Sequence, residues 1–454
     1  MTTIWAEQAL ITTGWAQSVC VEIGDDGRVM SVNQGVEPKG HRCGVLLPAP
    51  VNSHSHAFQR AMAGLTERRG ESPTDSFWTW RTLMYRFLDQ ISPDQVQAIA
   101  ALVQMEMLEA GFGTNVEFHY LHHQPDGTPY ANLSEMADRI AAAAARTGIG
   151  LTLLPVQYQF GGCDRRPLGA GQRRFGNGPD RFARLVADAR ETLSALPADA
   201  NLGVAPHSLR AVAPEQLRDA PEIADGGPVH IHIAEQIPEV EEVQSAWGAR
   251  PVEWAVANLP LDGRWCMIHA TQMTPEETVS LAKTGAVAGL CPITESNLGD
   301  GIFAGVRWMD AGGKISIGSD SNILISLAEE MRVLENSQRL RDHTRAALAD
   351  NTFSSGRRIF DGICAGGAEA AGRGAGRIAI GEWADLLALD MTHIDLCGLE
   401  GDQILDSFMV TGGNCMVADV WSAGRHVVQS GRHIHRDEIT RSYLEAVSSL
   451  RSGA

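Results

Sequence analysis

Short apolar runs alternate along most of the chain with longer stretches in which apolar residues recur at helical spacing. The helical patterns cover residues 92–110, 132–146, 180–196, 238–259 and 274–284, and several begin with a Ser, Asp or Thr that can cap a helix. The strand candidates are residues 45–48, 115–119, 150–158, 202–205, 229–234, 265–269, 286–291 and 314–318. Strands that alternate with helices favour a parallel sheet, and eight such units predict a TIM-like (β/α)8 barrel in the α/β class.

Further β-like segments lie at both ends of the chain, outside the barrel pattern. They cover residues 18–33 before it, and 384–389 and 419–429 after it. Neither end has enough apolar residues to be stable alone, so we expect the two ends to pair into one small β-sandwich. The predicted organisation is residues 1–47 as the amino-terminal part of the sandwich, 48–375 as the barrel, and 376–454 as the carboxyl-terminal part with a tail.

Composition narrows the class of protein. A chain of 454 residues suits one barrel with a small added module. The 55 acidic and 37 basic residues give a net charge of −18, which argues against nucleic acid or an anionic membrane as a partner. The eight cysteines form no CxxC pair, and no signal peptide or span of about 20 apolar residues is apparent. We therefore expect a cytoplasmic protein.

Polar residues with metal-binding side chains follow the ends of the predicted strands. His54 and His56 stand two apart, so in extended backbone both imidazoles point to one side; alone, such a pair could be part of a surface turn. Loops after the strands build the active sites of such barrels. The other strand-end residues are His119, Tyr120, His207, Arg210, His232, Glu235, His269 and Asp320. Imidazoles with one carboxylate suit Zn²⁺ or Fe²⁺. We expect His230 to be a buried, hydrogen-bonded side chain, and His122 and His123 to lie in a loop.

The HxH pair, the HxxE motif at His232–Glu235, the lone His269 and the Ser319-Asp320 pair together resemble the amidohydrolase superfamily, in its mononuclear branch of adenosine, cytosine and guanine deaminases. Binuclear members usually carry a carbamylated lysine after the fourth strand, and the three lysines of this chain stand elsewhere. The resemblance implies one divalent ion, best matched by Zn²⁺, although a bridging carboxylate stays open. The implied ligands are His54, His56, His232 and Asp320.

A finer resemblance rests on residues 52–65, 76–86, 117–120, 207–210 and 298–303, which are similar to the formimidoylglutamate deiminases within that superfamily. It implies hydrolysis of N-formimino-L-glutamate, a dicarboxylate, to N-formyl-L-glutamate and ammonia in histidine degradation, by a homodimer. The implied catalytic residues are Glu235, His269 and Asp320. The implied substrate contacts are Gln59, Arg81, Tyr120, His207 and Arg210. One position departs from the family pattern, because Asn322 stands where a histidine is expected.

Two other functions remain as alternatives. A deaminase of an aminated heterocycle, such as guanine or an adenosine, would need a flat aromatic slot, and two arginines at the strand ends argue against it. A noncatalytic scaffold would have lost ligands, whereas this chain retains them all. Residue by residue, Glu235 could instead be a carboxylate favoured by a helix N-terminus, and either arginine could be a surface ion-pair partner.

Overall fold

In a computed structural model of the chain, residues 1–67 and 84–452 are described. The parallel strands lie side by side in the order β10-β11-β12-β13-β5-β6-β7-β8, and β9 also pairs with β7. Single bridges from Val204 to Val229 and from Ser208 to His232 bring the two ends of this curled sheet together. The strands are β5 (Val51–Ser55), β6 (Thr114–His119), β7 (Gly150–Gln157), β8 (Asn201–Leu202), β9 (Ala205–Pro206), β10 (Val229–Ile233), β11 (Trp265–His269), β12 (Val287–Leu290) and β13 (Lys314–Ile317). The predicted barrel is confirmed.

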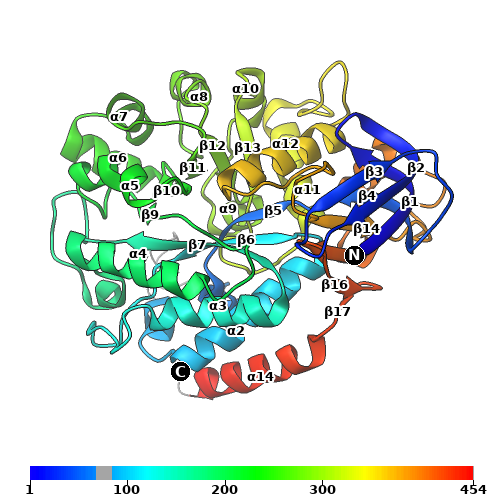
Figure 1. Cartoon of the computed structure of the whole chain (residues 1–454). Coiled ribbons are helices and arrows are strands. Elements are labelled where there is room, and N and C mark those ends of the chain that lie inside the picture. The colour runs from blue at the N-terminus through cyan, green and yellow to red at the C-terminus, as the bar shows by residue number, and fades with distance from the viewer. Residues whose placement is uncertain (68–83, 453–454) are drawn as a thin grey trace.

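Helices surround this sheet (Figure 1). Those described are η1 (Ala57–Met62), α2 (Pro93–Glu109), α3 (Glu135–Thr147), η2 (Ala170–Phe175), α4 (Pro179–Leu193), α5 (Pro214–Ile223), α6 (Ile237–Trp247), α7 (Pro251–Asn258), α8 (Pro275–Ala282), α9 (Pro292–Leu298), α10 (Gly305–Asp310), α11 (Leu327–Asp342), α12 (Ser355–Ala370), α13 (Asp402–Thr411), η3 (Asn414–Met416) and α14 (Arg436–Ser452). Prolines at the first turns and caps such as Ser92, whose hydroxyl accepts from the Gln95 amide, begin many of them. The last two α-helices return to the barrel, because α13 packs on α11 and α12, and α14 packs on α2.

Strands from the two chain ends pair with each other, as the sequence predicts, and they form one separate mixed sheet (Figure 1). Its strand order is β17-β16-β15-β14-β4-β1-β2-β3. The bounds are β1 (Thr2–Ile11), β2 (Gly14–Ile23), β3 (Val29–Asn33), β4 (His41–Pro48), β14 (Leu386–Leu389), β15 (Val417–Ser422), β16 (Arg425–Gln429) and β17 (Arg432–His433). The sheet has its own buried core, which includes Ile4, Val19, Leu46, Leu386 and Trp421. We call it the terminal sheet.

One strand assignment was wrong. Residues 45–48 were expected to be the first barrel strand, but they end β4 of the terminal sheet, where they pair with β1 and β14. The barrel starts with β5 at Val51. Pro48 and Pro50 explain the break, because neither has an amide hydrogen to continue a ladder. Both runs are apolar, and the pattern alone did not show that the chain changes sheets between them.

The terminal sheet is joined to the amino ends of the barrel strands by buried ion pairs. Arg373 donates to both carboxylate oxygens of Asp385, at 2.7 and 3.0 Å, and its Nη2 also lies 3.0 Å from Asp199 Oδ2. Arg425 donates to both oxygens of Asp199, at 2.9 and 2.7 Å. Thr114, the first residue of β6, donates to Asp385 Oδ2. We call Arg373, Arg425, Asp199 and Asp385 the basal network.

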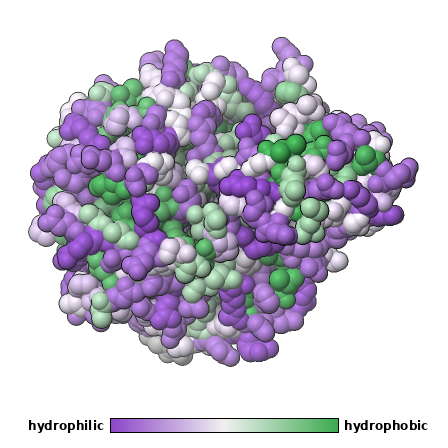
Figure 2. Space-filling model, viewed as in Figure 1, coloured by the Kyte–Doolittle hydropathy of each residue, from purple (hydrophilic) through white to green (hydrophobic). Residues whose placement is uncertain are grey.

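The visible surface is mainly hydrophilic (Figure 2). Figure 2 shows a face on which hydrophilic residues predominate and hydrophobic ones are scattered in small groups. Within the described residues, none of the helices combines the length and the apolar character that crossing a membrane requires.

Candidate metal centre and active site

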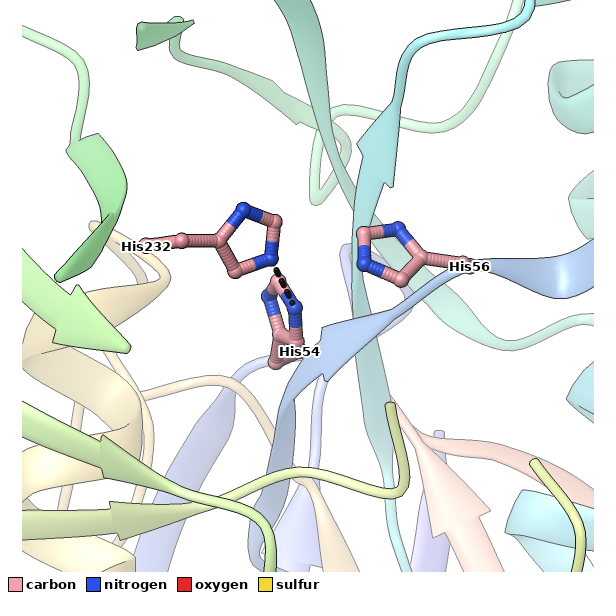
Figure 3. A group of neighbouring side chains, drawn as sticks. All are labelled: His54, His56 and His232. Atoms are coloured by element: carbon pink, nitrogen blue, oxygen red, sulfur yellow. Dashed lines mark hydrogen bonds between the residues drawn. The ribbon is translucent and has the colours of Figure 1, made fainter. Parts of the chain in front are cut away.

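Three histidines meet at the carboxyl ends of the barrel strands. His54 lies in β5, His56 follows that strand, and His232 lies in β10; their rings face one another in Figure 3. The Nε2 atoms of His54 and His232 are 3.0 Å apart. The Nδ1 atoms of His56 and His232 contact the carbonyl oxygens of Phe118 and His207, at 3.0 and 3.1 Å. These contacts aim Nε2 at the common centre, the arrangement typical of metal-ligating histidines.

Asp320 brings a carboxylate to the same centre. Its Oδ1 lies 3.3 Å from His56 Nε2 and 3.5 Å from His54 Nε2. The backbone holds it there, since the Asp320 amide donates to the His54 carbonyl and the His56 amide donates to the Asp320 carbonyl. The structure therefore brings together the four side chains expected as ligands.

The electrostatics of this cluster fit a divalent cation. Burial lowers the pKa of His54 and His232 well below the usual value and that of His56 to about 3, so the rings are neutral, as ligation requires. Burial also raises the pKa of Asp320 to about 7, with the negative charge of Glu235 adding to the effect and His269 opposing it. A dehydrated carboxylate beside neutral imidazoles is stabilised by a cation.

His269 connects this centre to two glutamates. It ends β11 with a φ of +69°, and its Nε2 lies 3.8 Å from Asp320 Oδ2 and 3.9 Å from Glu235 Oε1. Its Nδ1 contacts Glu295 Oε1 at 3.3 Å. Burial alone would lower the pKa of His269, but the charges of Glu235, Asp320 and Glu295 raise it well above the usual value. A proton held here lies next to both candidate proton-transfer groups.

A pocket opens over the centre, and most of the residues expected to contact substrate line it. Its wall consists of His56, Gln59, Met84, Tyr85, Tyr120, Tyr158, Phe175, His207, Arg210, His232, Glu235, His269, Leu298, Asp320 and Ser321. Gln59 donates to the Tyr120 hydroxyl at 2.8 Å. Arg210 is largely buried and its Nη2 lies 4.0 Å from Glu239 Oε2. Arg81 lies outside the described residues.

Two supporting glutamates were missed. Glu239, in the first turn of α6, is fully buried and accepts from the amides of Ala234 and Glu235 at 3.1 and 3.0 Å. Glu295, in α9, accepts from the Cys291 amide and contacts His269. The one available signal for Glu239 was its place directly after Pro238 at the start of a predicted helix, where a carboxylate is favoured.

The structure shows what Asn322 does at the position where the family pattern has a histidine. Its side-chain amide donates to the Ser55 hydroxyl and to the carbonyls of His56 and Asp320, at 3.0–3.2 Å, and its oxygen accepts from Ser319. Asn322 has a φ of +57°, a conformation that asparagine adopts more readily than most residues. The asparagine therefore ties together the two segments that carry His56 and Asp320.

His230, His122 and His123 lie as expected, whereas the strand-end candidate His119 does not. His230 is buried, its Nε2 contacts the Ala370 carbonyl at 2.7 Å, and burial lowers its pKa to about 4. His122 and His123 lie between β6 and α3, where their Nε2 atoms contact the carbonyls of Val156 and Gly176. His119 is buried beside His122 and does not line the pocket.

Comparison with known proteins identifies the family. A model described as the amidohydrolase family matches residues 45–427, and one described as "Formimidoylglutamate deiminase HutF, N-terminal domain" matches residues 1–42. Formimidoylglutamate deiminase of Pseudomonas aeruginosa is 46% identical over 456 residues, covering 99% of this chain and 100% of that protein.

Solved structures agree. A crystal structure of an amidohydrolase from Brucella melitensis has a TM-score of 0.94 and 48% identity, covering 99% of this chain and 100% of its own. An adenosine deaminase from Xanthomonas campestris with bound zinc has a TM-score of 0.82 and covers 99% and 98%, but at 20% identity it supports the fold alone. The chain therefore belongs to the amidohydrolase family and is similar along its full length to a formimidoylglutamate deiminase.

Proposed function

We propose that this chain hydrolyses N-formimino-L-glutamate to N-formyl-L-glutamate and ammonia. The observation that carries the proposal is a single pocket lined by the histidine–aspartate centre, by Glu235 and by the guanidinium of Arg210. The full-length relative of that activity supports the choice of substrate. The resemblance also predicts a homodimer.

The proposed cofactor is one divalent ion, Zn²⁺, at the pocket. His54, His56, His232 and Asp320 are the residues that would hold it, with the coordination completed from solvent. When bound, it would lower the pKa of a water molecule toward neutrality and polarise the group under attack.

The protein groups supply positions and protons. Asp320 lies where it can accept a proton from a water molecule, and His269, which holds a proton of its own, lies where it can orient that water molecule. Glu235, whose carboxylate lies 3.9 Å from His269, can protonate the imino nitrogen as the water oxygen adds to the formimino carbon. The nitrogen then takes a second proton, the one that Asp320 accepted from water. The bond between this nitrogen and the former formimino carbon breaks, and ammonia leaves. The added hydroxyl becomes the formyl carbonyl and returns its proton to Glu235. Arg210 binds a substrate carboxylate, which its planar guanidinium can do in a bidentate manner.

The test is ammonia release by the Zn²⁺-loaded chain from N-formimino-L-glutamate, guanine and adenosine, each assayed alone. We expect release from the first substrate. Ammonia from guanine or adenosine, and none from N-formimino-L-glutamate, would establish the heterocycle deaminase instead.

Arg210→Met sharpens the test. One lost charge-assisted pair should lower kcat/KM for N-formimino-L-glutamate by roughly 10- to 150-fold, without loss of the metal. Arg218→Met, an exposed arginine on α5, is the matched control. If kcat/KM of Arg210→Met differs from that of the parent by less than twofold, Arg210 does not bind a carboxylate of the substrate.

A further inference from the structure

Two histidines and an aspartate form a second cluster on the terminal sheet. It lies away from the carboxyl ends of the barrel strands, which we call the barrel mouth. His41 begins β4, Asp419 lies in β15 and His426 lies in β16. Their ligand atoms all lie within 4.8 Å of one another. Among the described residues, it is the one such group of three that includes no barrel-mouth residue.

The two imidazoles face opposite oxygens of one carboxylate. His426 Nε2 lies 2.8 Å from Asp419 Oδ1, and His41 Nε2 lies 3.4 Å from Asp419 Oδ2. His41 Nε2 is shielded from solvent and makes no hydrogen bond to any part of the chain that the structure describes. A solvent-shielded nitrogen that has no hydrogen bond and lies 3.4 Å from a carboxylate oxygen is better satisfied by a cation that it shares with that carboxylate.

Trp421 fixes the directions of both rings. His426 stacks on it with ring centroids 4.4 Å apart at 17°, and His41 meets its edge at 5.2 Å. Trp421 itself is fully buried in the core of the terminal sheet. Because the rings are held by packing, their nitrogens are placed for ligation before an ion arrives.

The cluster is also accessible. The side chains of His41, Asp419 and His426 are 35%, 14% and 26% exposed, so an ion can enter and water can fill its remaining coordination position. Two imidazoles and one carboxylate are a ligand set for zinc and its neighbours in the first transition row.

We propose that His41, Asp419 and His426 bind a second divalent transition-metal ion of the zinc class on the terminal sheet. The ion would join β4, from the amino-terminal end of the chain, to β15 and β16, from the carboxyl-terminal end. An ion that binds only the folded chain stabilises it, so this site acts as a clip between the two ends and takes no part in hydrolysis.

The experiment counts Zn²⁺ bound per full-length chain, by calorimetric titration and by metal analysis after dialysis. The parent should bind two ions. Asp419→Asn should bind one and keep its ammonia-release activity, and the double variant His54→Asn/His56→Asn should also bind one. The second equivalent should raise the Tm of the parent and leave that of Asp419→Asn unchanged.

His343→Asn is the matched control, because this exposed histidine ends α11 with a φ of +53°, which asparagine also adopts. It should bind two ions. If Asp419→Asn fails to fold, the partly exposed His41→Gln and His426→Gln variants replace it. Each should weaken the second ion by at least the roughly 10- to 100-fold lost when a mere supporting partner is removed.

A parent chain that binds a single ion would overturn the proposal. So would a second ion that survives in Asp419→Asn, or in both histidine variants, with unchanged affinity. The count is independent of the substrate, so a failure of the proposed hydrolysis would leave its interpretation intact.

Discussion

Each end of the barrel buries a cluster of charged and titratable side chains. The two clusters differ in how their charges are balanced. At the amino end, the basal network pairs two arginines with two aspartates, and their formal charges cancel. At the mouth, Asp320, Glu235 and Glu295 lie around His269, with neutral histidines beside them. The first cluster pairs its charges within the protein, whereas the second brings imidazole nitrogens and carboxylate oxygens together around one point, an arrangement that can hold a metal ion.

Hydrogen bonding shows the same difference. Both oxygens of Asp385 and both oxygens of Asp199 accept from guanidinium groups, and the Ala423 amide adds a further bond to Asp385. At the mouth, burial raises the pKa of Asp320 to about 7. Buried charges that are fully paired and hydrogen-bonded hold segments of the chain together. Buried carboxylates without a cationic partner can instead bind a ligand and transfer protons.

The largest effect should come from breaking the basal network. Arg373→Met removes the cationic partner of the buried Asp385 carboxylate and one of the two cationic partners of Asp199, so the free energy of unfolding should fall by about 3–5 kcal/mol. Urea denaturation measures it. Arg377→Met, which removes an exposed partner of Glu382, should cost about 0–1 kcal/mol. If the free energy of unfolding falls equally in the two variants, burial does not make the Arg373 ion pairs stronger than the exposed Arg377 pair.

At the mouth, Glu235→Gln should act on rate and not on stability. We expect kcat to fall roughly 10²-fold or more, because the proposed proton donor is lost, with the metal content unchanged. Steady-state ammonia release and metal analysis measure both. Glu241→Gln, an exposed position on the same helix α6, should retain the parent kcat. Loss of the metal together with the activity would make Glu235 a ligand or its support.

A smaller effect should follow from Asn322→Ala. This change removes the bonds that tie the His56 and Asp320 segments together, so the mouth ion should bind about 10- to 100-fold more weakly. Competition with a chromophoric chelator measures the affinity. Parent-like affinity would mean that the backbone hydrogen bonds between these segments suffice.

The smallest effect concerns pH. Burial alone would raise the pKa of Asp199, but Arg425 and Arg373 hold it below the usual value. A lowered pKa in the folded state adds stability that is present above the unfolded pKa and is lost as the pH falls through the folded one. Below about pH 4, Asp199→Asn should therefore show a shallower loss of unfolding free energy than the parent, by at most about 1.4 kcal/mol per pH unit. Parallel acid titrations would contradict this.

The sequence predicted the side chains at the barrel mouth better than it predicted the basal network. Period-two spacing and strand ends placed His54, His56, His232 and Asp320 among the candidates at one edge, because parallel strands place their carboxyl ends together. The choice of these four as ligands came from the family resemblance, since the same cues also pointed to His119, which does not line the pocket. Neither cue gave the partners of Arg373, which come from segments far apart in the chain. The support from Asn322 was hidden for the same reason, since its bonds depend on a left-handed backbone and on Ser55 across the barrel.

The terminal sheet also constrains the order in which the chain can fold. During synthesis β1, β2, β3 and β4 emerge first, but the second edge of β4 pairs with β14, which emerges after the whole barrel. Until then β4 presents an unpaired edge ending in the apolar run Val45-Leu46-Leu47, a template for pairing with other nascent chains. A ribosome stalled before Leu386 would thus hold a chain in which β4, at the edge of the incomplete terminal sheet, is exposed to aggregation.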